Sequence, residues 1–254
     1  MKRILLAVLL STALRASNTS CSTGGTPTGG CPGMDTGFSS NASAVAGGTL
    51  LSQANANQIT SWLGLTDVLY TNIFSEAYAG QSTVNDFHLA ADNQGQTVVV
   101  LQVTPQGSST PVLIGGYDPV SWNAALNSYV MDPTDAGRTA FIYNLSTTTI
   151  QRQDLTSQNG NEGIYQTLNA PGYGPIFGGG WDIGIFSGET YVYNFSYGGT
   201  TSGTLNILGN AGATNMTVDE IEVYTVSNEA PEPSTFCLLG AGLGAALWLQ
   251  RNRT

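Results

Sequence analysis

Positive charge is scarce in the middle of this sequence. Seven of the 254 residues are Lys or Arg, and five of these lie among the first 15 or the last four residues. Between residues 17 and 230 only Arg138 and Arg152 remain, against 16 acidic residues, so this part carries a net charge of −14. Because proteins bind phosphate backbones with Lys and Arg, this balance excludes nucleic acid as a partner and disfavours anionic membrane surfaces.

Cysteine and histidine are also rare. Cys21 and Cys31 flank a Gly/Thr-rich segment near the N-terminus, and Cys237 lies in an apolar stretch near the C-terminus. In an oxidising compartment the first two could close a small disulfide loop. His88 is the one histidine, and no Cys/His cluster has the spacing of a zinc site, so no metal or cofactor is predicted. The G-x-S-x-G marker of many serine hydrolases is absent as well.

The N-terminus has the order of an export signal. Lys2 and Arg3 precede a short apolar run, Ile4–Leu10, which small residues follow. This order predicts a signal peptide over residues 1–16, with cleavage there or somewhat later. Lipid attachment at Cys21 is an alternative, although the residues before it lack the aliphatic side chain that such sites usually carry.

The C-terminus holds three parts in a fixed order. The Pro231-Glu232-Pro233 turn precedes an apolar stretch, Phe236–Leu249, and then a basic end with Arg251 and Arg253. The apolar stretch has 14 residues, which is short against the roughly 20 that span a bilayer as a helix. The arginines are expected to hold that end on the cytoplasmic side of the membrane.

Over residues 231–254 this tail resembles the PEP-CTERM sorting signal of Gram-negative bacteria. The resemblance implies a hydrophobic transmembrane helix in an inner-membrane intermediate, and removal of the tail near the PEP turn by the membrane protease exosortase. It also implies a final location in the cell envelope or outside the cell. An ordinary C-terminal anchor is the alternative.

Between the two ends the composition changes twice. Residues 17–48 are rich in Gly, Thr and Ser and have few large apolar side chains, which predicts a flexible lead-in. Residues 49–227 are long enough for one domain with a sizeable core. The domain opens with a predicted helix over residues 53–63, which Ser52 caps and Gly64 ends.

After this helix the apolar residues alternate with a period of two. Short β-branched and aromatic segments, separated by turn residues, predict antiparallel strands and favour a two-layer β-sandwich with a few short helices, mainly β in an α+β arrangement. The predicted strands cover residues 68–70, 86–91, 97–103, 112–117, 140–145, 182–186, 190–195 and 219–224.

Four blocks in this region resemble the TLDc domain family. They are the opening helix, I-G-G-Y-D-P-V-S-W, A-F-I-Y-N-L and G-Y-G-P-I-F-G-G-G-W-D-I-G-I, and the strand D-E-I-E-V-Y closes the domain. The residues that carry the resemblance are Gly115, Gly116, Trp122, Tyr173, Gly174, Phe177, Gly178, Gly179, Gly180 and Asp182.

The resemblance implies a two-sheet β-sandwich. Eukaryotic members are linked to protection from oxidative stress and to binding of the vacuolar proton pump, but the family has no agreed catalytic residues that could be carried over. Fold and family therefore do not supply the function.

The motif glycines have two interpretations each. The Gly178–Gly180 run could cradle a phosphate, but no Lys follows it, so a tight entry into the Asp182 strand is the stronger interpretation. Gly115 and Gly116 are interpreted as a β-bulge or strand end rather than a ligand loop.

Carboxylates are the only abundant acid/base groups. Glu220 and Glu222 share one face of a predicted strand, where they form either a solvated outer surface or an acid/base or cation site. Together with Asp182, which is expected to bond nearby turn amides, they are the candidate catalytic residues. Asp118 is predicted to cap the turn after Pro119. The turn with two further acids, at residues 132 and 135, offers fewer than the roughly six to eight oxygens that Ca²⁺ prefers.

Two functions remain open. The first is a non-enzymatic envelope or matrix protein, delivered by the export machinery and exosortase, that binds exopolysaccharide or another surface protein. Trp122, Tyr173 and Trp181 lie near turns and would offer stacking surface for sugars. The second is a weak hydrolase that uses the three candidate carboxylates. His88 is interpreted as a structural residue of a strand in both.

Overall fold

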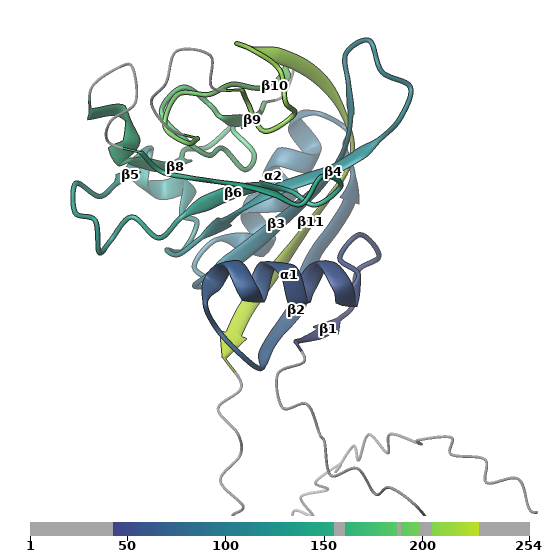
Figure 1. The fold of residues 1–254 in the computed structure, drawn as a ribbon, viewed down its shortest axis with the longest axis vertical. Coiled ribbons are helices and arrows are strands. Elements are labelled where there is room, and N and C mark those ends of the chain that lie inside the picture. Colours follow the sequence, from purple (N-terminus) through teal and green to yellow (C-terminus); the bar gives the residue numbers. More distant parts are fainter. Residues whose placement is uncertain (1–42, 155–160, 187–188, 199–204, 229–254) are drawn as a thin grey trace, which may run out of the picture. The chain divides into compact units, whose positions relative to one another are not determined.

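The computed structural model describes residues 43–154, 161–186, 189–198 and 205–228 (Figure 1). The predicted signal peptide, the cysteines and the sorting-signal residues lie outside these ranges. No helix among the described residues is long and apolar enough to cross a membrane. The first strand, β1 (Ala44–Ala46), lies within the segment that the sequence assigned to the lead-in, so the folded part begins before residue 49.

Nine of the eleven strands in the described ranges belong to one large sheet. Seven of its strands follow the order β1-β2-β11-β3-β4-β6-β7, which we call the main sheet, and all neighbours are antiparallel except the parallel pair β1 and β2. Its further strands are β2 (Val68–Ala77), β3 (Thr97–Pro105), β4 (Val112–Asp118), β6 (Phe141–Asn144), β7 (Thr149–Arg152) and β11 (Thr214–Asn228).

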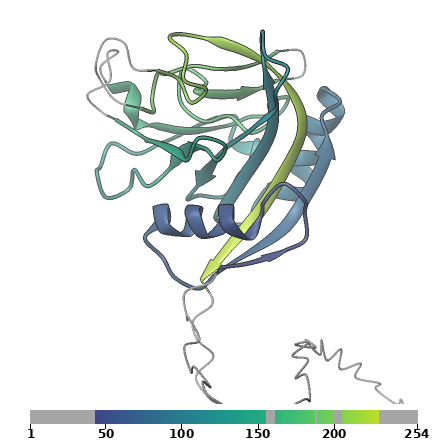
Figure 2. The same cartoon turned by 45° about the vertical axis from the view of Figure 1, so that its right-hand side comes forward.

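A smaller layer continues from the beginning of β11. There β10 (Thr190–Val192) pairs with β11 and with β9 (Ile183–Ile185). The antiparallel pair β5 (Ser128–Met131) and β8 (Tyr165–Asn169) joins this layer through isolated bridges at Phe177. We call these four strands the second layer. The two layers make a β-sandwich-like fold, as the sequence predicted (Figures 1 and 2).

Two helices cover the main sheet from opposite sides. The core between the layers also contains residues of α2 (Gln81–Ala91), whereas a separate core lies between the main sheet and α1 (Gln53–Leu63). Alternate residues of β3 enter the two cores, with Val99 and Leu101 in the first and Val98 and Val100 in the second. A strand buried on both faces needs an unbroken apolar run, and this explains V-V-V-L in the sequence.

The predicted helix over residues 53–63 is confirmed together with its ends. Ser52 accepts a hydrogen bond from the amide of Asn55 at 3.2 Å, and Gly64 has the left-handed conformation, with φ of 67°. This conformation suits glycine, which has no Cβ to clash.

The predicted strand over residues 86–91 is wrong, because these residues form the second half of α2. The buried residues Val84, Phe87, His88 and Ala91 follow the i, i+3, i+4, i+7 spacing of a helix face. The alternation looked like a strand because a window that starts at residue 86 omits Val84 and the first turn. The sequence also missed β1, β5, β7 and β8, which are three to five residues long.

Candidate functional site

The Gly178–Gly180 turn packs closely against neighbouring side chains. Gly178 has a φ of +82°, and a Cβ there would overlap the carboxylate of Asp182. A Cβ on Gly180 would overlap the ring of Phe195 in the same way. The tight-entry interpretation is therefore confirmed, because the glycines are needed for close packing against this protein's own side chains.

Asp182 is a buried structural acceptor. Its Oδ1 accepts hydrogen bonds from the amides of Phe195 at 2.6 Å and Tyr197 at 3.1 Å, and the amide of Ser196 lies 3.0 Å from both carboxylate oxygens. Burial raises the pKa of Asp182 to about 7, and these N–H groups oppose that shift. The donors come from a segment 13 to 15 residues further along the chain, not from the turn beside Asp182 as expected.

Glu222 is buried as well, so the expectation of a solvated outer face is wrong for it. Its carboxylate accepts hydrogen bonds from the amides of Thr49 at 2.6 Å and Leu50 at 2.9 Å, and from the hydroxyl of Tyr224. Burial opposes ionisation, but these bonds outweigh it and hold the pKa of Glu222 below its ordinary value. Glu222 thus fixes the chain segment that leads into α1, whereas Glu220 on the same strand is half-buried.

The candidate carboxylates do not meet in one place. Asp182 bonds Tyr197, which packs in the core between the layers, whereas Glu222 bonds Tyr224, which packs in the core beneath α1. They therefore lie on opposite sides of the main sheet. Within the described ranges no three His, Cys, Asp or Glu side chains are grouped so that they could bind a metal.

Asp118 caps the turn after Pro119 as predicted, because its Oδ1 accepts from the amide of Val120 at 3.1 Å. Its other oxygen, Oδ2, is buried and has no hydrogen-bond partner among the described residues. Burial raises the pKa of Asp118 to about 8, against the opposing effect of the Val120 amide. Nothing in the described contacts links this group to Glu220 or Glu222.

The three aromatic residues proposed for sugar stacking differ in exposure. Trp122 is fully buried, and its Nε1 donates to the hydroxyl of Thr97 at 2.8 Å, so it cannot stack on a ligand. Tyr173 and Trp181 are half-buried and both contact Phe186, with ring centroids 5.7 Å and 4.6 Å from it.

Further aromatic rings extend this surface. The ring of Tyr191 lies 5.8 Å from that of Trp181, and the Trp181 Nε1 donates to the hydroxyl of Tyr129 at 3.0 Å. The rings of Tyr193 and Phe195 stack at 6.1 Å. We call these half-buried side chains the aromatic face: Tyr129, Tyr173, Trp181, Phe186, Tyr191, Tyr193 and Phe195.

A hollow of about 340 Å³ opens beside the aromatic face, and we call it the tyrosine hollow. Tyr191 and Tyr193 supply its aromatic side chains, and Glu189 and Asn215 its carboxylate and amide. Gly180 and Ala213 complete the lining. This hollow was not predicted from the sequence, although the spacing T-Y-V-Y-N-F indicates that alternate aromatic residues share a face.

Comparison with known families agrees with the fold. Residues 45–227 match the family model of the TLDc domain, which is well over half of the chain. The chain belongs to the TLDc domain family. Residues 229–253 match the PEP-CTERM protein-sorting motif, which supports an exported protein that exosortase sorts through a membrane-anchored intermediate to the cell envelope. No curated protein matches the sequence.

The TLDc-like glycines of β4 have a packing role. Gly115 and Gly116 pair regularly with β3 and β6, so the interpretation as a bulge or strand end is wrong. A Cβ on Gly115 would overlap the carbonyl oxygen of Val99, and one on Gly116 would lie 2.5 Å from the ring of Phe177. These positions thus admit large neighbours into the core.

His88 connects α2 of the TLDc domain to the aromatic face. Its Nε2 lies 2.7 Å from the carbonyl oxygen of Tyr173, which can only accept, and its Nδ1 lies 2.8 Å from Oδ1 of Asp92. Both ring nitrogens therefore have partners within the protein. This supports a structural role for His88, on a helix rather than on the predicted strand.

Proposed function

We propose that this protein is a component of the cell envelope or extracellular matrix whose TLDc domain binds a neutral polysaccharide at the tyrosine hollow. The sorting motif supports its delivery to the cell surface. The observation that carries the binding function is the hollow itself, where two tyrosine rings meet a carboxylate and an amide next to half-buried Trp181. Its volume of about 340 Å³ lies within the range of small-molecule sites.

The side chains of the hollow match the two surfaces of a sugar. The C–H face of a sugar ring packs against aromatic rings, which bury apolar area at low cost in side-chain entropy. The hydroxyl groups can donate to Glu189 and both donate to and accept from Asn215. The hollow has no cationic lining residue, so a neutral polymer fits it better than an anionic one.

Hydrogen bonds to Asp182 stabilise the shape of the tyrosine hollow. The carbonyl oxygen of Asp182 accepts from the amide of Tyr193 at 3.3 Å, and its carboxylate binds the three following amides from Phe195 onward. These hydrogen bonds fix the segment that carries Tyr193 before a ligand binds. A preorganised segment loses less conformational entropy on binding.

Other functions have weaker support in the described residues. A carboxylate-dependent hydrolase would need converging carboxylates, but Asp182 and Glu222 lie on opposite sides of the main sheet. A role in oxidative stress follows only from the family resemblance.

The test is a calorimetric titration of the full-chain protein with neutral hexasaccharides such as cellohexaose and maltohexaose. We expect saturable binding to at least one, and an affinity loss of about tenfold or more in Tyr193→Ala because the ring contact is removed. Tyr193→Phe keeps the ring and is the matched control, with a loss below about threefold. Absence of binding to every polymer, or unchanged affinity in Tyr193→Ala, would contradict the proposal.

Processing is tested separately, by mass spectrometry of protein recovered from a host with exosortase and from its exosortase-null counterpart. We expect the tail beyond the Pro231–Pro233 turn to be missing only in the first host. An intact Arg253-Thr254 end in both hosts would refute processing.

A further inference from the structure

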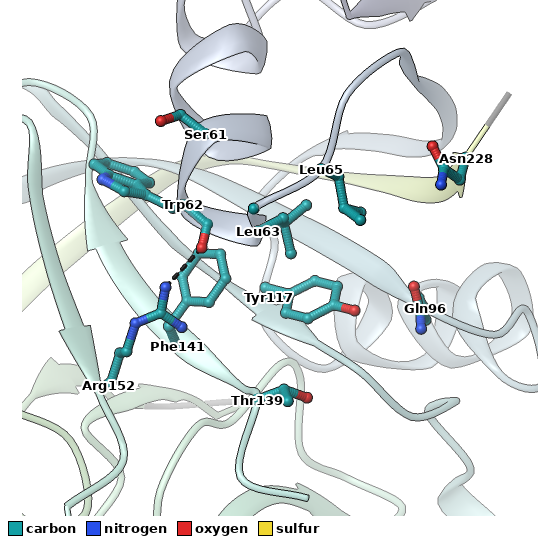
Figure 3. A pocket seen from close by; sticks show the side chains of 11 residues that line it. Ser61, Trp62, Leu63, Leu65, Gln96, Tyr117, Thr139, Phe141, Arg152 and Asn228 are labelled. Carbon is teal, nitrogen blue, oxygen red and sulfur yellow. Dashed lines mark hydrogen bonds between the residues drawn. The ribbon is translucent and has the colours of Figure 1, made fainter. Parts of the chain in front are cut away.

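A second and larger hollow lies at the C-terminal end of α1, on the opposite side of the main sheet from the second layer. Its volume is about 660 Å³, and we call it the arginine pocket (Figure 3). Half-buried Trp62 of α1 supplies its accessible ring, and Arg152 at the end of β7 supplies a guanidinium. Tyr117 of β4 and Phe141 of β6 line the pocket as buried side chains. The pocket thus combines ring surface with one positive charge.

The charge of this pocket is unusual for the domain. The described ranges contain 14 acidic side chains and two arginines, yet no acidic side chain lines the pocket. The other arginine, Arg138, has a side chain only 8% exposed and pairs with Asp135. Arg152 is therefore the single exposed cation in the described part of the chain. The acidic side chains elsewhere on the surface repel an anion, whereas Arg152 attracts an anion to the arginine pocket.

The guanidinium of Arg152 is held in place before any ligand arrives. Its Nη2 donates to the carbonyl oxygen of Trp62 at 2.6 Å, and its central carbon lies 5.2 Å from the centroid of the Phe141 ring (Figure 3). Guanidinium has five N–H donors in a planar fork, and the bond to Trp62 uses one of them. The bond also satisfies a carbonyl in the last turn of α1, so Arg152 has a structural role in addition to any ligand.

We propose that the arginine pocket binds a uronic acid residue of an acidic polysaccharide. The carboxylate of the sugar bonds the fork of Arg152, and the sugar ring packs against half-buried Trp62, while Gln96 and Thr139 offer partners for its hydroxyl groups. One guanidinium balances the single charge of a carboxylate, whereas a phosphate group carries about −1.5 to −2. The inference rests on the proposed function only in taking a polysaccharide as the source of the sugar.

The test compares two small ligands of nearly equal shape, sodium glucuronate and the neutral glucuronamide, by NMR titration of the full-chain protein. We expect glucuronate to bind at least tenfold more tightly, because only its carboxylate forms charge-assisted bonds with Arg152. Equal affinity of the wild-type protein for the two ligands would by itself overturn the proposal. Inorganic sulfate binding as tightly as glucuronate would overturn the assignment to a sugar acid.

Two arginine variants locate the effect. Arg152→Gln keeps a polar side chain but loses the charge, and we expect it to lose the preference for glucuronate. Arg138→Gln is the matched control, since it removes the other arginine of the domain, and we expect it to keep the preference. Retention of the preference in Arg152→Gln would overturn the proposal. Thermal melting of each variant verifies that it is folded.

The two sites can fail independently. Tyr193→Ala is expected to lose binding of neutral hexasaccharide and to keep binding of glucuronate, and Arg152→Gln is expected to show the reverse. Glucuronate binding without any neutral ligand would refute the proposed function and leave the arginine pocket standing. Neutral binding without discrimination between glucuronate and glucuronamide would do the opposite.

Discussion

The tyrosine hollow and the arginine pocket lie in the same acidic domain but have opposite local chemistry. The first contains Glu189 and no cation, whereas the second contains Arg152 and no carboxylate. Both are lined by aromatic rings. The net charge of a chain therefore predicts which partners its surface as a whole repels. The ligand of an individual site depends on the side chains that line that site.

Asp182 and Asp118 are two buried carboxyl groups of the domain with different surroundings. Asp182 binds the segment that carries Tyr193, and Asp118 follows Tyr117 at the end of β4. Burial raises the pKa of both groups. The two groups differ in partners, because Asp182 accepts from three backbone amides and Asp118 from one. We expect this difference to separate the effects of their replacement.

The largest expected effect is that of Asp182→Ala. The change leaves the amides of Phe195, Ser196 and Tyr197 without their acceptor, and a buried unsatisfied donor costs about 1–3 kcal/mol. We expect the free energy of unfolding in urea to fall by about 3 kcal/mol or more, with loss of neutral ligand binding. Asp182→Asn keeps one acceptor oxygen and should lose about half as much. Equal stability of wild type and Asp182→Ala would contradict this role.

The second effect is a pH dependence that Asp118→Asn removes. The pKa of Asp118 is about 8 in the folded protein and about 3.9 in an unfolded chain, so its contribution to stability is fully present below about pH 4 and is lost as the pH rises toward 8. We expect the stability of the wild type relative to Asp118→Asn to fall by about 1.4 kcal/mol per pH unit within this window. Urea unfolding of both proteins at pH 5, 6 and 7 measures the slope. Asp182 titrates in both proteins, so its effect cancels in the difference between them. Parallel stability profiles of the two proteins would contradict the assignment of this pH dependence to Asp118.

The smallest expected effect concerns the carboxylate of the tyrosine hollow. Glu189→Gln replaces a charged acceptor by a neutral one, and a hydrogen bond contributes about 0.5–1.5 kcal/mol. We expect the affinity for a neutral hexasaccharide to fall about threefold, while the affinity for glucuronate at the arginine pocket stays unchanged. Calorimetry with both ligands on one sample checks this. An equal change in both affinities would mean that the two hollows are not independent.

The parts of the fold that sequence could predict depend on local patterns. The ends of α1 at Ser52 and Gly64 could be predicted because a cap involves only neighbouring residues. The V-V-V-L run of β3 likewise indicates a strand that is buried on both faces. By contrast, α2 was missed because its first turn, which contains Val84, is needed to distinguish a period of 3.6 from a period of two. The TLDc-like blocks identified glycines that pack closely in the structure. They did not indicate which aromatic rings contact these glycines.

The sites could be predicted only in part, since they join residues that are distant in sequence. Tyr173 and Trp181 were singled out as stacking residues and do meet on the aromatic face through Phe186. Arg152 and the Trp62 carbonyl are 90 positions apart, and no local pattern indicates their contact. The burial of Glu222 depends on Thr49, 173 positions away.

The most direct test of the account is one crossed titration. Wild type, Tyr193→Ala and Arg152→Gln are each titrated with cellohexaose, maltohexaose and glucuronate. The account predicts that Tyr193→Ala weakens only the neutral hexasaccharides, by about tenfold or more, and that Arg152→Gln weakens only glucuronate. No binding of any neutral hexasaccharide to the wild type, or equal loss of both ligand classes in either variant, would contradict it.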